Sequence, residues 1–177
     1  MNFFTADWHL GHNGILYSDE RPFQNVDIMQ KTLSDNINAC VNEYDTLYVI
    51  GDVAYKHKKD QPELIENFLD TLKVHRKILI IGNHDTLNWE QYIDCGFQSV
   101  HSHLEIKEGN DSFQLIHDPS VAGCFRSLNW ICGHVHRSYK KCNNVVNVGC
   151  CAWDYKPISI LEVKKTIKQR DLLINVE

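Results

Sequence analysis

The 177-residue chain lacks several features that would assign it to a particular class of protein. None of its apolar runs approaches the roughly 20 residues that a membrane-spanning helix needs. Its first residues, MNFFTADWH, hold neither a basic segment nor a sustained apolar one, so we expect no signal peptide and a cytoplasmic location. Basic residues are in the minority, and the formal net charge of −5 argues against long nucleic acid as a partner.

The seven cysteines lack the spacing of a disulfide framework or a zinc ribbon. Their number is odd and no two of them form a CxxC pair, so we expect reduced thiols. Cys132 and Cys150 lie in apolar, strand-like runs, where we expect them to act as small core residues. The full set is Cys40, Cys95, Cys124, Cys132, Cys142, Cys150 and Cys151.

The chain also lacks internal repeats, low-complexity tracts and flexible linkers, and its length suits one domain over residues 1–177. In the first half, strand and helix patterns alternate. Apolar residues recur every three or four positions in the two helical segments. The pattern predicts a strand at FFTA (3–6), a helix over about 26–44, a strand over 46–52, a helix over about 62–73 and a strand over 77–85.

The second half consists mostly of short strand candidates joined by turns at 108–111 and 141–144. The candidates are SVHSHLEIK (99–107), SFQLIH (112–117), LNWICGH (128–134), NVVNVG (144–149) and PISILEVK (157–164). A half in which strands and helices alternate, followed by a half of strands, predicts an α/β fold with two sheets packed as a sandwich and helices outside. In open α/β sheets, binding sites form beyond the carboxyl ends of the strands.

Five of the predicted strands end in polar residues that can bind metal. Asp7 and His9 alternate, so we expect both side chains on one face of a strand. A single histidine at a strand end is usually a polar cap, but five of the ten histidines fall in these five ends. Histidine, carboxylate and amide oxygen together suit Mn, Fe, Zn or Ni better than Ca. The donors are Asp7, His9, Asp52, Asn83, His84, His117, His134 and His136, more than one ion needs, so we expect two ions.

The segments DWH, GD, GNHD, a solitary histidine and GHVH, in this order, resemble the five signature motifs of the calcineurin-like metallophosphoesterase superfamily. The match spans residues 7–136. It implies a four-layer α/β/β/α fold with two sheets and a dinuclear metal centre at the strand ends. The resemblance assigns Asp7, His9 and His136 to one ion and Asn83, His117 and His134 to the other, with Asp52 bridging both.

The same resemblance implies that His84 acts on the substrate and is not a metal ligand. A hydroxide between the two metals would attack phosphorus, and His84 would stabilise charge or protonate the leaving oxygen. Asp85 either orients neighbouring groups or caps the loop.

Finer features, DWHLGHNG with RPF (21–23) and VGCCAWDYKPIS (148–159), resemble a small bacterial and phage-type branch of predicted phosphoesterases. In the loop after the first motif, His12, Asn13 and Arg21 are candidates to contact substrate, although each would equally suit a solvated loop. The phosphate-clamping arginine that phosphoprotein phosphatases carry after GD is absent, and Lys56 stands at its spacing. The rest of the basic run 56–59 is typical of a solvated face.

The sequence therefore predicts a metal-dependent hydrolase of small phosphate esters, nucleotides included, with diesters preferred over monoesters. Two alternatives remain open. ADWHLG also resembles the first motif of double-strand-break-repair nucleases, and a retromer subunit of this fold with a degraded site serves as a binding module. The complete donor set and the presence of His84 favour the enzyme. The native substrate, the physiological metal, the oligomeric state and the role of the cysteines are not determined by the sequence.

Overall fold

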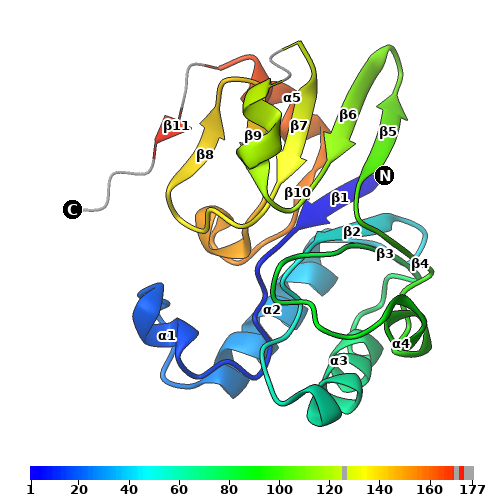
Figure 1. Cartoon of the computed structure of the whole chain (residues 1–177), viewed down its shortest axis with the longest axis vertical. Helices are drawn as coiled ribbons and strands as arrows, with labels where there is room; N and C mark the ends of the chain where they lie inside the picture. Colours follow the sequence, from blue (N-terminus) through cyan, green and yellow to red (C-terminus); the bar gives the residue numbers. More distant parts are fainter. Residues whose placement is uncertain (125–126, 170–171, 174–177) are drawn as a thin grey trace.

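The computed structural model describes residues 1–124, 127–169 and 172–173, and two β-sheets form its centre (Figure 1). The first sheet has five strands in the order β10-β1-β2-β3-β4. Strands β1 to β4 run parallel, and β10 is antiparallel to β1. Their bounds are β1 Asn2–Thr5, β2 Thr46–Ile50, β3 Arg76–Ile80, β4 Ser99–His101 and β10 Ile158–Ser159.

The second sheet has six strands in the order β11-β8-β9-β7-β6-β5. Strands β6, β7 and β9 are parallel, whereas β5, β8 and β11 pair antiparallel with their neighbours. Their bounds are β5 Leu104–Glu108, β6 Asp111–Leu115, β7 Asn129–Cys132, β8 Tyr139–Cys142, β9 Val145–Asn147 and β11 Leu172–Leu173. Parallel strands in both sheets bring several strand ends, and the loops that follow them, to one edge of the molecule.

Alternating residues of the central strands divide the apolar core into two layers. Phe4, Ile50 and Ile80 belong to the cluster between the sheets, together with Phe113 and Ile131 of the second sheet. Their neighbours on the opposite face, such as Leu47 and Leu79, belong to a separate cluster with the helices. This period of two follows from the pleat of a strand, which sends successive side chains to opposite faces.

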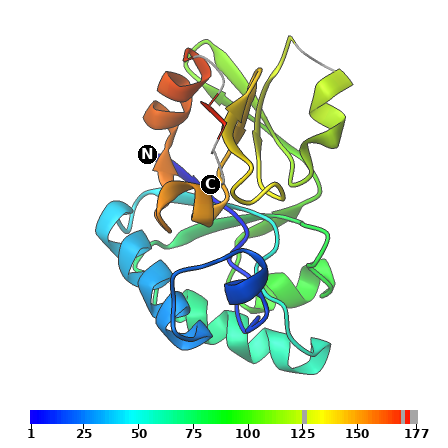
Figure 2. The same ribbon diagram turned by 90° about the vertical axis from the view of Figure 1, so that its left-hand side faces the viewer.

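The helices flank the sheets (Figure 2). Helices α2 (Val26–Cys40), α3 (Gln61–Asp70) and α4 (Trp89–Asp94) cover the first sheet, and α5 (Ile160–Ile167) contributes to the cluster between the sheets. The shorter elements are α1 (Ile15–Ser18) and the 3-10 helices η1 (Lys58–Asp60), η2 (Pro119–Cys124) and η3 (Cys150–Trp153). The predicted α/β class with two sheets flanked by helices is confirmed. Among the described residues, no helix has both the length and the apolarity to cross a bilayer.

Several predicted boundaries are corrected by local hydrogen bonds. The helix predicted over 26–44 ends at Cys40, because Asp45 accepts from the backbone N–H of Asn42 and holds 42–45 in a turn. The predicted strand 157–164 is wrong after its third residue. Ser159 caps a helix by accepting from the N–H of Glu162, and α5 buries the residues at helical spacing.

Further differences concern the chain after β3. The predicted strand 99–107 is two strands of different sheets, β4 and β5. Helix α4 has a capping box at Asn88 and Gln91, which was not predicted, and β8 occupies part of the predicted turn at 141–144. Cys132 and Cys150 are buried as expected, although Cys150 begins η3 and is not in a strand.

Candidate metal centre

The predicted donors lie in loops that are bonded to one another at the carboxyl ends of the strands. After β1, the N–H of Asp7 donates to the carbonyl of Gly51 at 3.0 Å, and the N–H of His9 donates to that of Asp52 at 3.0 Å. The two sheets are joined at the same point, because the N–H of His134 donates to the carboxylate of Asp7 at 3.0 Å. Backbone bonds therefore hold the loops in register before any ion is considered.

Left-handed backbone, and not strand alternation, orients these side chains. Strand β1 ends at Thr5, and Asp7 and His9 have φ angles of 57° and 52°. The prediction that they alternate along a strand is therefore wrong. Asp52, His134 and His136 also have positive φ, at 56°, 71° and 46°. Non-glycine residues adopt this conformation at a cost, and such residues gather at functional sites.

The predicted donors form two groups, and these share Asp7; a further group of possible ligands joins His136 to Asp19 and Cys151. In the first group, ligand atoms of Asp7, His9 and His136 lie within 4.8 Å of one another. In the second, ligand atoms of Asp7, Asp52 and His117 do the same. The carboxylate of Asp52, which belongs to the second group, also lies near the first. Its Oδ2 is 3.6 Å from Nε2 of His9 and 3.4 Å from Nε2 of His117.

Asn83 and His134 extend the second group. The amide oxygen of Asn83 lies 3.0 Å from Nε2 of His117 and 2.9 Å from Nδ1 of His134. The other ring nitrogen of His117, Nδ1, lies 2.7 Å from the carbonyl of Ile50, a contact that fixes the ring and directs Nε2 to the site. The seven side chains that the resemblance assigns to metal therefore lie in one cluster at the strand ends, in which Asp7 belongs to both groups of three.

The electrostatics of this cluster follow from its burial. Burial lowers the pKa of His9 to about 3, so the ring is neutral and one of its two nitrogens has a lone pair available. Burial is the largest single influence on His117 and Asp52, but their mutual hydrogen bond, neighbouring charges and backbone hydrogen bonds together outweigh it, raising the pKa of His117 to about 9 and lowering the pKa of Asp52 to about 2. Burial raises the pKa of Asp7. A buried carboxylate of this kind is stabilised by a cation beside it.

The residues present fit divalent metal ions. His9 is 2% exposed, and neither of its ring nitrogens has a hydrogen-bond partner. A buried polar atom without a partner costs about 1–3 kcal/mol, and coordination to a metal would satisfy it. The mixture of imidazole, carboxylate and amide oxygen is the donor set of Mn, Fe, Zn or Ni.

Gly51 allows a close approach between the two sheets in the site. Its φ of +81° is in the left-handed region, and an added Cβ would collide with the ring of His117 and lie 2.7 Å from the Cα of Gly82. Only glycine permits the second-sheet ligand to lie this near to the first-sheet loop.

His84 and Asp85 follow Asn83 and play different parts. The backbone N–H of His84 donates to Asp52 at 2.9 Å, and its ring centroid lies 5.5 Å from that of His9. The ring thus stands beside the donor groups without belonging to either. Asp85 accepts from the N–H groups of Gly82, Asp52 and Val53 at 2.7–2.9 Å. Burial raises its pKa to about 6. Its carboxylate ties two ligand loops together.

The predicted substrate contacts are only partly brought together. The ring centroid of His12 lies 5.6 Å from that of His9 and 4.2 Å from that of Tyr55. Lys56 lines a hollow that His84 also lines. Asn13 is exposed in the same loop as His12.

Arg21 does not fit the predicted substrate role. Its side chain is fully buried, and it donates to the carbonyl of Asp7 at 2.8 Å, that of Trp8 at 3.1 Å and the carboxylate of Asp19 at 3.0 Å. The guanidinium therefore supports the backbone of the first motif and is not available to grip a phosphate.

Asp19 was not predicted, yet it contacts the candidate ligand His136 directly. Its Oδ2 lies 3.2 Å from Nδ1 of His136 and also accepts from Arg21. A carboxylate on the second nitrogen of a ligating histidine fixes the ring and its tautomer. Asp19 and His136 are 117 positions apart in the sequence, so no local pattern could have joined them.

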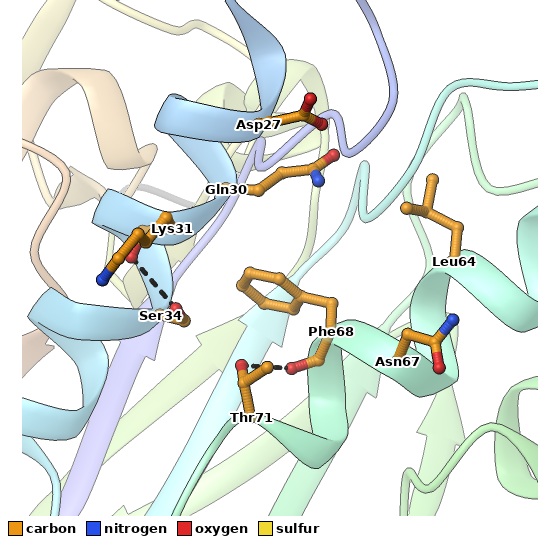
Figure 3. A pocket seen from close by; sticks show the side chains of 8 residues that line it. All are labelled: Asp27, Gln30, Lys31, Ser34, Leu64, Asn67, Phe68 and Thr71. Atoms are coloured by element: carbon orange, nitrogen blue, oxygen red, sulfur yellow. Dashed lines mark hydrogen bonds between the residues drawn. The ribbon is translucent and has the colours of Figure 1, made fainter.

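A second hollow, of about 270 Å³, lies between α2 and α3 (Figure 3). Phe68 reaches between the two helices, and Gln30 stands on the rim. The side-chain oxygen of Gln30 accepts from the N–H of Gly11 at 2.8 Å, so this helix pair supports the loop that carries His12. None of the predicted ligands lines this hollow.

The fold and the site together define an α/β protein of two packed sheets with a candidate metal centre at the strand ends, and comparisons with known proteins agree with the fold. No protein-family model matches the chain. An uncharacterized protein from Methanocaldococcus jannaschii is 27% identical, with 94% of this chain and 91% of that protein covered.

Two solved structures are similar over nearly the whole chain. A protein of unknown function from Aquifex aeolicus has a TM-score of 0.72 and 22% identity, covering 94% of this chain and 99% of that chain. A structure described as a novel archaeal phosphodiesterase has a TM-score of 0.52 and 16% identity, covering 97% of this chain and 98% of that chain. At these identities the similarity shows a shared fold.

Proposed function

We propose that the chain belongs to the calcineurin-like metallophosphoesterase superfamily, in its small bacterial and phage-type branch, and hydrolyses small phosphate esters, diesters in preference. We further propose two divalent metal ions, with Mn²⁺ first and Fe, Zn or Ni as alternatives. The observation that carries the proposal is the convergence of seven donors from five loops into two groups that meet at Asp7 and Asp52. The fold shared with a structure described as an archaeal phosphodiesterase supports it.

In this proposal, Asp7, His9 and His136 would hold one ion and Asn83, His117 and His134 would hold the other, and the carboxylate of Asp52 lies close enough to His9 and His117 to serve both. Two divalent ions, when bound, supply Lewis acidity toward the phosphate and lower the pKa of coordinated water. The chain's own residues provide the rest. Asp85 and Arg21 hold the ligand loops by their backbone groups, so the donors are positioned in advance.

His84 acts on the substrate. Its backbone is held by Asp52, while its ring lies beside His9 and Tyr55 and lines an open hollow. From there the imidazole can donate a proton to the leaving oxygen, or a hydrogen bond to the charge that develops on the phosphate.

A preference for diesters follows from the supply of cationic side chains. A dianionic monoester needs several cationic donors around its terminal oxygens. Arg21 is committed to backbone carbonyls and Asp19, so it cannot contribute. A diester carries one negative charge and requires fewer such donors.

The test compares 4-nitrophenyl phosphate with bis(4-nitrophenyl) phosphate, using protein reconstituted with Mn²⁺. We expect the diester to have the higher kcat/KM. A kcat/KM for the monoester ten times that for the diester would refute the preference, and turnover of neither, with short oligonucleotides cleaved instead, would favour the nuclease alternative.

The role of His84 is tested by His84→Ala with metal analysis. We expect a loss of about 10²–10⁴-fold in kcat, as for a general acid, with two metal ions per chain retained. A collapse of metal content would show that His84 is a ligand and that its assignment is wrong. One ion per chain under metal-replete conditions would contradict the bridge at Asp52.

A further inference from the structure

The hollow beside His84 has a lining of unusual charge for this protein. It encloses about 420 Å³, and Lys56, His57 and Lys58 line it together with Tyr55, Asn83 and His84. None of its lining residues is acidic, whereas the whole chain carries a net charge of −5. A cationic hollow in an acidic protein attracts an anion by simple Coulomb interaction.

The position of the hollow relates it to the substrate. Of the seven predicted ligands, only Asn83 lines it. In the proposed function the phosphate that is hydrolysed lies over the donor groups, which places it at the edge of the hollow that Asn83 and His84 line. The space beyond His84 is left for the part of the substrate that is not being hydrolysed. Its volume is within the usual range for small-molecule sites.

The surroundings of Tyr55 indicate which chemical group of the substrate lies between the hydrolysed phosphate and the part in the hollow. Its ring lies 4.2 Å from the ring of His12 and 5.3 Å from that of His84, and the residue is 47% exposed. A half-exposed aromatic ring supported on one side by another ring offers an apolar surface for a sugar or a base.

From this placement we propose that the hollow binds a second phosphate group of the substrate through Lys56, His57 and Lys58. The inference rests on the proposed phosphoesterase function and deepens it. The preferred substrate is a nucleotide-like phosphodiester that carries an additional phosphate. Lysine is suited to this role because its ammonium group binds phosphate as a point charge.

The neighbouring Lys59 provides a matched control. Lys58 and Lys59 are consecutive, both are exposed and both belong to η1, but only Lys58 lines the hollow. Replacing either by glutamine changes the net charge equally. A difference between the two variants therefore measures a local contact and not the overall field of the protein.

The experiment uses two chromogenic diesters that differ only by the extra phosphate, thymidine 5′-(4-nitrophenyl phosphate) and its 3′-phosphorylated form. In the unmodified protein we expect kcat/KM for the phosphorylated form to be higher by about tenfold, through KM, because one hydrogen bond to a charged group has about this effect. Lys58→Gln should bring the ratio close to one, and Lys59→Gln should leave it unchanged.

A binding measurement separates this inference from the proposed function. Thymidine 3′,5′-bisphosphate and thymidine 5′-monophosphate are titrated into the same three proteins by calorimetry. If neither diester is hydrolysed but the bisphosphate binds more tightly in a Lys58-dependent way, the binding site is supported and the proposed function fails. If both diesters are hydrolysed with equal kcat/KM, or if Lys59→Gln lowers the ratio as much as Lys58→Gln, the site is refuted while the function stands.

Discussion

Replacing Asp19 by asparagine should weaken metal binding at the first donor group. Asp19 Oδ2 lies 3.2 Å from Nδ1 of His136, and its side chain is only 10% exposed. Removing such a partner of a ligating histidine typically reduces metal affinity by about 10–100-fold, or about 1.4–2.7 kcal/mol. Because Asn83, His117 and His134 do not contact Asp19, the second group should keep its affinity.

The assay is calorimetric titration of Mn²⁺ into metal-free protein, with Glu20→Gln as the control. Glu20 is the next residue, its side chain is 76% exposed, and its substitution removes the same charge. Since Asp19 also binds Arg21, the free energy of unfolding of the metal-free variants is measured alongside, which separates loss of fold from loss of affinity. If the Mn²⁺ affinity of each donor group in Asp19→Asn is within about threefold of its affinity in the unmodified protein, the argument is refuted.

Further predictions concern the packing and the ions. Gly51→Ala should destabilise the fold by about 1–3 kcal/mol in denaturant unfolding and reduce metal content, because its Cβ would meet the ring of His117; unchanged metal content would contradict this. Phe113→Ala, in the cluster between the sheets and 1% exposed, should cost about 3–5 kcal/mol in urea unfolding, and a cost below about 1 kcal/mol would show that the sheets do not depend on this contact. A chelator should lower Tm and added Mn²⁺ should restore it, with about 2.7 kcal/mol of stabilisation at 100 times Kd; a Tm indifferent to both would argue against bound metal.

The pattern of apolar runs and polar strand ends predicts much of the fold and nearly all of the donor groups. Short apolar runs rich in β-branched residues, such as TLYVI and KILII, favour buried strands, and a glycine followed by Asp52 or Asn83 marks where each strand stops. Once the strands are parallel, their carboxyl ends share an edge, so the donors must meet there. This reasoning needs only local sequence and one rule of sheet topology.

Local sequence patterns fail to predict the secondary structure of a segment whose residues suit both a strand and a helix. Residues 157–164 alternate like a strand, yet Ser159 caps a helix whose buried residues also fit helical spacing. Periodicity in a short segment cannot choose between the two, because the choice depends on what the segment packs against. Ile160 and Val163, on one face of the helix, pack in the cluster between the sheets, and this packing selects the helix over the strand.

The sequence by itself therefore determined the class of fold, because strand and helix patterns depend on the order of apolar residues, and it named the candidate donors at the strand ends, among which the family resemblance set His84 apart. The tertiary structure alone decided how the ligands are aimed and what supports them. Asp7 and His9 converge through left-handed backbone held by bonds to Gly51 and Asp52, which no side-chain pattern reveals. Arg21 binds a backbone carbonyl and not the substrate, and Asp19 contacts His136. Both results depend on contacts between distant segments. Such contacts depend on how the whole chain packs and have no signature in the local sequence.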